Sequence, residues 1–255
     1  MNVRIMTGYF VWNELATTDT AAARKFYSHL FGWEFKKEEL GEMEYYTARL
    51  GERMIGGLMP IAPREEIPSH WLSYVNVDDV DSRTEMAVRL GGKQIVPPRD
   101  IPKTGRFSVI RDPQGAYIAP FRALKEGDMP EGESQANAFC WHELLTPDPE
   151  GAKRFYQEVF GWGLQKHDMP EGEPYWMFKT GEKTVGGIWR MPPEADFPPH
   201  WLTYLCVEDV DAMARKVAEA GGEVMKEPQD IPDVGRFAVL RDNTGGVFAI
   251  YKGKE

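Results

Sequence analysis

The segment FVWNELATTDTAAARKFYSHLFGW at residues 10–33 returns as FCWHELLTPDPEGAKRFYQEVFGW at residues 139–162, which is 129 positions later. The agreement is too long to arise by chance. Self-similarity over this length predicts that the chain contains two copies of one domain.

The repeat continues to the end of the chain, with HWLSYVNVDDVD at 70–81 returning as HWLTYLCVEDVD at 200–211. Here the shift is 130, because one residue is gained between Trp162 and Gly186. A length of 255 residues suits two domains of about 100–150 residues each. We therefore expect one domain at 1–124, a polar linker rich in Gly, Pro and acidic residues at 125–137, and a second domain at 138–255.

Each copy divides once more into two halves that begin with a strand-like run followed by a helix. In the first half, Thr18 or Asp19 is placed to cap a helix that Gly32 ends, and its apolar side chains fall four residues apart at Ala22, Phe26 and Leu30. In the second half, helical spacing links Val80, Thr84, Ala87 and Leu90, and their counterparts Val210, Ala214, Val217 and Ala220. Three short strand-like runs follow each helix, so the predicted order is β-α-β-β-β, four times.

This fourfold βαβββ order carries two phrases, "D…A..FY...FGW" in the first half and "V.DVD…GG…P.DIP..GRF.V..DPQG" in the second. Over nearly its whole length the chain thereby resembles the vicinal oxygen chelate superfamily of glyoxalases, bleomycin resistance proteins and extradiol dioxygenases. The resemblance implies an α+β fold in which four βαβββ modules form two cup-shaped domains, with the ligand on the concave face. It also implies that the chain is a monomer whose repeats imitate the dimer of single-domain relatives.

Composition narrows the possible partners. The net charge of −10 repels phosphate backbones and anionic lipid, so we expect neither nucleic acid nor a membrane as partner. No apolar run is long enough to cross a membrane and the N-terminus lacks a signal-peptide core, which favours a cytoplasmic protein. Cys140 and Cys206 are the only cysteines, and we expect them to be small buried hydrophobic residues.

The resemblance allows the family's metal ligands to be sought position by position, and both copies lack them. Metalloenzymes of the family take His, Gln or Glu from the first strand of each module and Glu from a last strand. The corresponding positions here carry Trp12, Leu72 and Ala119 in the first copy and Trp141, Leu202 and Ala249 in the second. Indole, isobutyl and methyl groups do not coordinate divalent cations, so we predict no metal and no other cofactor at this site.

Other polar residues lie close to these positions. Glu14 and Glu143 share a strand face with Trp12 and Trp141, and a carboxylate desolvated there suits a general base; a solvated or salt-bridged glutamate is the equal alternative. His142 lies on the opposite face, so a catalytic role for it is not expected.

Further candidates come from the second half of each domain. His70 and His200 are placed to bind an anionic or carbonyl oxygen or to make a structural hydrogen bond. Tyr74 and Tyr204 are candidate lining residues that could stack on a small molecule.

Two arginines and the tryptophans complete the candidates. Arg106 and Arg236, in the phrase DIPxxGRF, could receive a carboxylate or phosphate, or could pair with the nearby Asp100 and Asp230. The tryptophans of FGW and HWL are expected to pack in the core.

These residues favour a protein that binds a small carbonyl-bearing or aromatic molecule in one or both cups without a metal, and leave open whether it is an enzyme. One alternative is a metal-dependent enzyme resembling lactoylglutathione lyase or a dioxygenase, with shifted ligands such as Glu14 or His70. The other alternative is a non-catalytic protein that sequesters a drug, for which the acidic surface would suit a cation.

Overall fold

The computed structural model describes residues 7–39, 43–61, 67–124, 135–169 and 173–254. Of the predicted linker at 125–137, all but the last three residues lie outside this part of the chain. Within it, no helix is long and apolar enough to cross a membrane.

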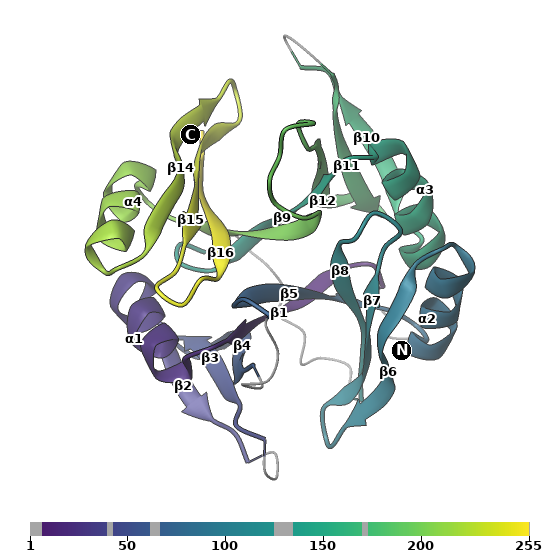
Figure 1. Ribbon diagram of the computed structural model, residues 1–255, viewed down its shortest axis with the longest axis horizontal. Coiled ribbons are helices and arrows are strands. Elements are labelled where there is room, and N and C mark those ends of the chain that lie inside the picture. The colour runs from purple at the N-terminus through teal and green to yellow at the C-terminus, as the bar shows by residue number, and fades with distance from the viewer. Residues whose placement is uncertain (1–6, 40–42, 62–66, 125–134, 170–172, 255) are drawn as a thin grey trace. The chain divides into compact units, whose positions relative to one another are not determined.

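Four modules follow one another along the chain, each with the predicted order β-α-β-β-β (Figure 1). Module 1 consists of β1 (Phe10–Thr17), α1 (Thr20–Phe31), β2 (Glu34–Lys37), β3 (Tyr46–Leu50) and β4 (Arg53–Pro60). Module 2 consists of β5 (His70–Asn76), α2 (Val80–Arg89), β6 (Lys93–Ile101), β7 (Gly105–Arg111) and β8 (Tyr117–Ala123). Module 3 consists of β9 (Phe139–Thr146), α3 (Pro149–Phe160), β10 (Gly163–His167), β11 (Tyr175–Thr180) and β12 (Lys183–Arg190). Module 4 consists of β13 (His200–Cys206), α4 (Val210–Glu219), β14 (Glu223–Ile231), β15 (Gly235–Arg241) and β16 (Val247–Gly253).

The helix α1 begins and ends at the residues that the local sequence predicted. Of the two predicted caps, Asp19 is the one used: its carboxylate accepts from the backbone N–H groups of Ala21 and Ala22. Gly32 ends the helix with φ 69°, a left-handed conformation that glycine adopts without a steric penalty. The same type of cap and glycine end bound α3, so these predictions are confirmed in both copies.

Two helices end one residue before their pattern suggests, α2 before Leu90 and α4 before Ala220. Leu90 was expected to continue the apolar face of α2, but the helix ends at Arg89 and Leu90 is 40% exposed. The two glycines that follow take the chain out of the helix, with φ 90° at Gly91, so Leu90 turns away from the core. The other predicted residues of this face, Val80, Thr84 and Ala87, are buried.

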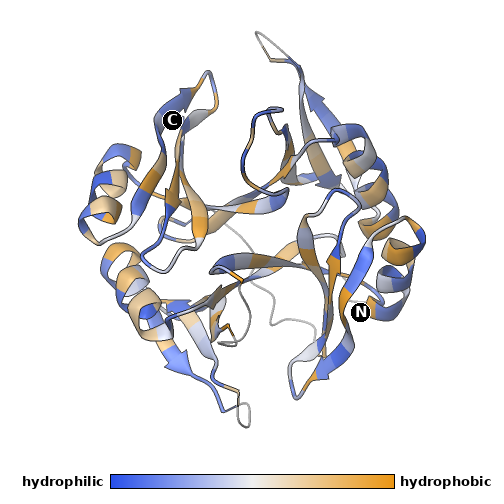
Figure 2. Cartoon of the chain, in the orientation of Figure 1, coloured by the Kyte–Doolittle hydropathy of each residue, from blue (hydrophilic) through white to orange (hydrophobic). Residues whose placement is uncertain are grey.

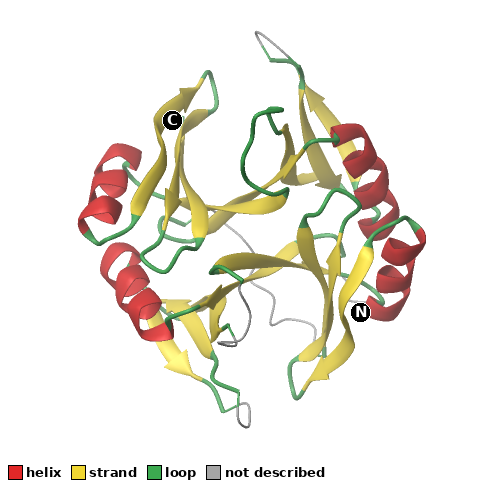
Figure 3. Ribbon diagram, viewed as in Figure 1, coloured by secondary structure: helices red, strands yellow, loops and turns green. Residues whose placement is uncertain are grey.

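The strands form two eight-stranded sheets, one from each copy (Figure 3). The order is β2-β3-β4-β1-β5-β8-β7-β6 in the first and β10-β11-β12-β9-β13-β16-β15-β14 in the second. In each module the first strand runs parallel to the last and the other neighbours are antiparallel. The predicted α+β class and its four modules are confirmed.

The two compact units into which the chain packs do not coincide with the two sheets. The described residues within 1–11, 73–129 and 141–201 form one compact unit, which we call the 2+3 unit because it holds most of modules 2 and 3. The described residues within 12–72, 130–140 and 202–255 form the other, which we call the 1+4 unit. Within the units α2 lies beside α3 and α1 beside α4 (Figure 1).

Each unit has its own hydrophobic core, to which both of its modules contribute. The helices carry both hydrophobic and hydrophilic residues along their length, as amphipathic helices do (Figure 2). Trp33 and Trp162, the tryptophans of FGW, are each 2% exposed, which confirms that they are packing residues.

A buried polar chain also joins the two modules of each unit, and we call it the tyrosine clamp. In the 2+3 unit, the indole N–H of Trp201 donates to Tyr156 Oη at 2.9 Å, and that hydroxyl donates to Asp112 Oδ2 at 2.8 Å. The other oxygen of Asp112 accepts three backbone N–H groups of its own turn. In the 1+4 unit, Trp71, Tyr27 and Asp242 form the equivalent chain.

Candidate functional site

The predicted site residues of the first strands lie on one face of β1. Burial alternates along this strand, with Val11, Asn13 and Leu15 buried and Trp12 and Glu14 less so. Trp12 and Glu14 therefore project from the side of the strand opposite the core, as the two-residue period of a strand predicts.

A tyrosine that the sequence analysis did not single out connects these two side chains. Trp12 Nε1 donates to Tyr45 Oη at 3.0 Å, and the Tyr45 hydroxyl is also hydrogen-bonded to the Glu14 carboxylate. Because a carboxylate only accepts, the hydroxyl is the donor in the second bond. Indole, phenol and carboxylate thus form a directed chain, which we call the first triad.

Module 3 repeats the arrangement as the second triad. Trp141 Nε1 donates to Tyr175 Oη at 3.2 Å, and Tyr175 Oη donates to Glu143 Oε1 at 2.8 Å. A usable signal was present in the sequence, because Tyr45 and Tyr175 occupy equivalent positions in the two copies at the shift of 130.

Glycines in the neighbouring strand make room for the two tyrosines. Gly57 in β4 pairs with Glu14, and Gly187 in β12 pairs with Glu143. A Cβ atom added at Gly57 would collide with Tyr45 Oη, and one added at Gly187 would collide with Tyr175 Oη. Each of these two glycines is thus required by the close approach of a phenol, which explains the second glycine of the Gly-Gly pair in each strand.

The environment keeps both phenols protonated. Burial raises the pKa of Tyr45 and of Tyr175 well above the ordinary value, and the negative charge of Glu14 or Glu143 raises it further. Each tyrosine is therefore a neutral hydrogen-bond donor that holds its glutamate in place. The predicted role of Glu14 and Glu143 as general bases stays a prediction.

A surface hollow of about 600 Å³ adjoins the second triad within the 2+3 unit. Its lining includes Met169, Glu173, Tyr175, Trp176, Trp189 and Arg190. Arg190 Nε donates to Glu173 at 2.9 Å, and the Lys153 ammonium lies 3.9 Å from the centre of the Trp176 ring. This volume lies within the range of small-molecule sites, and its walls combine aromatic rings with charged groups.

The residues at the predicted metal positions do not fit a divalent cation. The Trp12 and Trp141 indoles donate their N–H to tyrosines, and Ala119 and Ala249 are fully buried methyl groups. Among the described residues, no three His, Cys, Asp or Glu side chains lie close enough together to hold a metal ion. We therefore derive no step through a metal.

His70 and His200, the first residues of β5 and β13, make hydrogen bonds to backbone carbonyl groups. His70 Nδ1 lies 2.9 Å from the carbonyl oxygen of Pro68, and His200 Nδ1 lies 2.9 Å from that of Pro198. A carbonyl only accepts, so Nδ1 carries the proton in both rings. Burial lowers the pKa of His200. The structural hydrogen bond considered for these histidines is thus present, and a ligand contact stays a prediction.

Tyr74 and Tyr204 are buried, each with 5% of its surface exposed. Tyr74 packs against Phe107 and Phe121, with ring centres 6.1 and 6.2 Å apart, and Tyr204 packs against Phe237 at 6.5 Å. Their predicted contact with a ligand stays a prediction.

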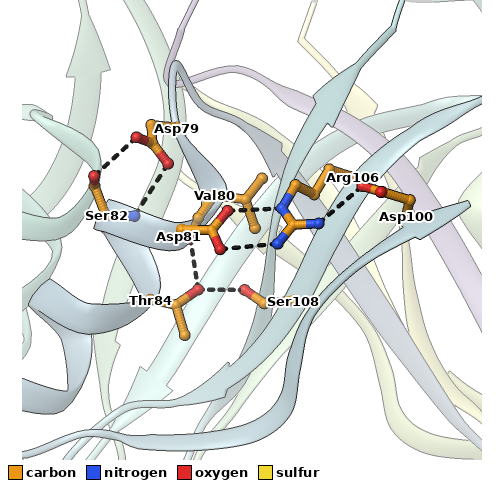
Figure 4. Close-up of polar contacts among 8 residues, drawn as sticks. All are labelled: Asp79, Val80, Asp81, Ser82, Thr84, Asp100, Arg106 and Ser108. Atoms are coloured by element: carbon orange, nitrogen blue, oxygen red, sulfur yellow. Dashed lines mark hydrogen bonds and ion pairs between the residues drawn. The ribbon is translucent and has the colours of Figure 1, made fainter.

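Two aspartates engage the Arg106 guanidinium (Figure 4). Nε and Nη2 donate to the two carboxylate oxygens of Asp81 at 2.6 and 2.8 Å, and Nη1 donates to Asp100 at 2.9 Å. Arg236 makes the same three bonds with the equivalent aspartates of module 4. The pairing with the neighbouring aspartate that was considered for each arginine is thus present, and contact with a ligand carboxylate or phosphate stays a prediction.

His142 faces the core, as its strand parity predicted. Its ring stacks on Phe10 with centres 3.8 Å apart, and burial lowers its pKa to about 3. It is therefore a neutral packing residue at neutral pH.

Comparison with known proteins gives one family and several relatives. A sequence model of the Glyoxalase/Bleomycin resistance protein/Dioxygenase superfamily matches residues 8–119 and again residues 139–250. "Putative glyoxylase CFP32" of Mycobacterium tuberculosis is 39% identical over 248 residues, covering 94% of this chain and 93% of that protein. "Anthracycline biosynthesis protein DnrV" of Streptomyces peucetius is 30% identical over 268 residues, covering 99% and 96%. The fold is similar to that of a Mn(II)-bound glyoxalase from Novosphingobium aromaticivorans, with a TM-score of 0.63 and 16% identity over 97% of this chain and 82% of that one.

Proposed function

Because the chain belongs to the glyoxalase, bleomycin resistance protein and dioxygenase superfamily, we propose that it binds a small carbonyl-bearing or aromatic molecule beside its two triads, without a metal at the family's ligand positions. The observation that carries this proposal is the Trp–Tyr–Glu chain that stands at the first strand of modules 1 and 3.

The triads supply two kinds of interaction to such a molecule. The indole and phenol rings offer flat apolar surface on which an aromatic or conjugated ligand can stack. The carboxylate already accepts one hydrogen bond from tyrosine and retains lone pairs for a hydrogen bond from a hydroxyl of the ligand. A ligand with a polarised O–H next to a carbonyl or an aromatic ring matches this combination.

The second triad is the better supported of the two sites. Tyr175 belongs both to this triad and to the wall of the 600 Å³ hollow, so a ligand in the hollow would contact a residue of the triad. The names of the two relatives, a glyoxylase and an anthracycline biosynthesis protein, agree with a carbonyl-bearing or aromatic ligand.

The test is a binding experiment with three probes on protein dialysed against chelator. The probes are the hemithioacetal of methylglyoxal and glutathione, catechol, and the anthracycline daunomycin. We expect at least one to bind by calorimetry with a Kd in the micromolar range, and metal analysis to find less than one equivalent of any divalent ion.

Variants tie the binding to the second triad. Glu143→Gln removes the charge but keeps the shape, and Tyr175→Phe removes the hydroxyl that orients it. Each is expected to weaken binding by about tenfold, which corresponds to roughly 1.4 kcal/mol. Tyr117→Phe is the matched control, because Tyr117 is 44% exposed and belongs to neither triad.

Three results would overturn the proposal. Stoichiometric metal together with turnover only in its presence would favour the metal-dependent lyase or dioxygenase. Unchanged affinity in both second-triad variants would remove the triad from the site. Failure of all three probes to bind at millimolar concentration would exclude the proposed ligand class. Binding without any product would support the sequestering function over an enzyme.

A further inference from the structure

The two cysteines of the chain lie together in the 1+4 unit although 66 positions separate them in sequence. Cys140 is in β9 and Cys206 ends β13, the neighbouring strand of the sheet. The backbone N–H of Cys206 donates to the carbonyl of Ala138 at 2.9 Å, which holds the end of β13 against the start of β9.

Side-chain contacts bring the thiols themselves into reach of each other. The Cys140 and Cys206 side chains interact with each other, and Cys140 Sγ donates at 3.6 Å to the carbonyl oxygen of Tyr204, two residues before Cys206. Both cysteines are partly exposed rather than enclosed in the core, so a small reagent can reach them. The expectation that they are buried hydrophobic residues is therefore wrong.

The first copy shows that the fold does not need this pair. Val11 stands where Cys140 stands in the repeat, and Asn76 stands where Cys206 stands. The same two strands are formed in both copies. The thiols thus add a chemical property to one copy of the repeat.

We propose that Cys140 and Cys206 form a dithiol site that a hydroperoxide oxidises to an intrachain disulfide. The Cys206 sulfur attacks the peroxide oxygen, which gives a sulfenic acid and releases water or an alcohol. The Cys140 thiol then attacks the sulfenic sulfur, the S–S bond forms, and a second water leaves. In sum, two thiols and one hydroperoxide give one disulfide, one alcohol or water, and one water.

The assignment of Cys206 as the attacking residue follows from the hydrogen bond that Cys140 makes. The Cys140 thiol donates to the Tyr204 carbonyl oxygen, which only accepts, so this bond holds Cys140 in its protonated form. Its interaction with Cys140 lowers the pKa of Cys206. The thiolate is the reactive form of cysteine, so the side chain that loses its proton more readily reacts first.

The test is mild oxidation of the native full-length protein with hydrogen peroxide. We expect both thiols to disappear together, the intact mass to fall by two hydrogen atoms, and peptide mapping to find residues 140 and 206 bridged. A reductant restores both thiols. A bridge between two chains, or no loss of thiols, would overturn the proposal.

Two variants separate the roles of the thiols. Cys140→Val introduces the residue of the first copy, and it should leave Cys206 as a sulfenic acid that dimedone traps. Cys206→Ser leaves only the less reactive thiol, and its loss should be about tenfold slower than that of wild-type Cys206. If Cys140 reacts as fast in Cys206→Ser as the thiols do in the wild type, the order of the two steps is wrong.

Discussion

Tyr156→Phe is the change with which to test the tyrosine clamp of the 2+3 unit. The hydroxyl that it removes is fully buried, donates to Asp112 at 2.8 Å and accepts from Trp201 at 2.9 Å. The substitution leaves the ring and its packing in place. It therefore isolates the two hydrogen bonds.

The expected loss in the free energy of unfolding follows from the polar groups that lose their hydrogen bond to the hydroxyl. A hydrogen bond to a charged group contributes about 1.5–3 kcal/mol, and a buried donor left without its partner costs about 1–3 kcal/mol. Asp112 keeps its three backbone N–H donors, which limits the loss at the carboxylate. We expect the free energy of unfolding to fall by about 2–4 kcal/mol.

The measurement is urea unfolding followed by far-ultraviolet circular dichroism and by tryptophan fluorescence. Agreement between the two probes shows whether a single transition is being measured. Tyr117→Phe, at an exposed tyrosine, makes the same chemical change and should alter the unfolding free energy by less than about 0.5 kcal/mol. If Tyr156→Phe costs no more than this control, the clamp does not hold the two modules together.

Three further predictions concern single positions. His142→Asn, which introduces the residue found at Asn13 in the first copy, should flatten the acid dependence of stability. The pKa of His142 is lowered to about 3, so the unfolded chain binds the proton first and stability is lost as pH falls from about 6.5 towards 3, by up to about 5 kcal/mol. Urea midpoints of both proteins across this range check this: if the ring were charged in the folded protein, the substitution would not flatten the dependence. Gly187→Ala should displace Tyr175 and weaken probe binding, measured by calorimetry, about tenfold. Gly163→Ala is the control, because a Cβ added there has only ordinary contacts, and equal affinities of the two variants would contradict the role of Gly187. Arg106→Lys should lower the urea midpoint only slightly, because its ion pairs are partly exposed. A shift as large as that of Tyr156→Phe would show that the fork geometry matters more than the charge.

Local features of the fold could be predicted from the sequence because their causes are local. The Asp19 cap and the Gly32 end each depend on a few neighbouring residues, and the repeat supplied a second example of both. Leu90 was placed wrongly because helical spacing does not show where the following glycines end the helix.

The site was harder to predict because its members meet only in the folded chain. Trp12 and Glu14 could be placed on one face by strand parity, but Tyr45 comes from the residue just before β3. The pairing of Arg106 with Asp100 was among the alternatives, whereas its second partner Asp81 lies at the start of α2. The contact between the two cysteines likewise depends on which strands become neighbours in the sheet.

The fact that both copies contribute to each core decides where the chain can be divided. Each core takes one module from the first copy and one from the second. Cleavage between the copies would leave two fragments, each carrying half of both hydrophobic interiors, and neither could complete one alone. Separately synthesised fragments would have to associate before either core could close, whereas in the single chain the two halves meet at a rate that does not depend on protein concentration.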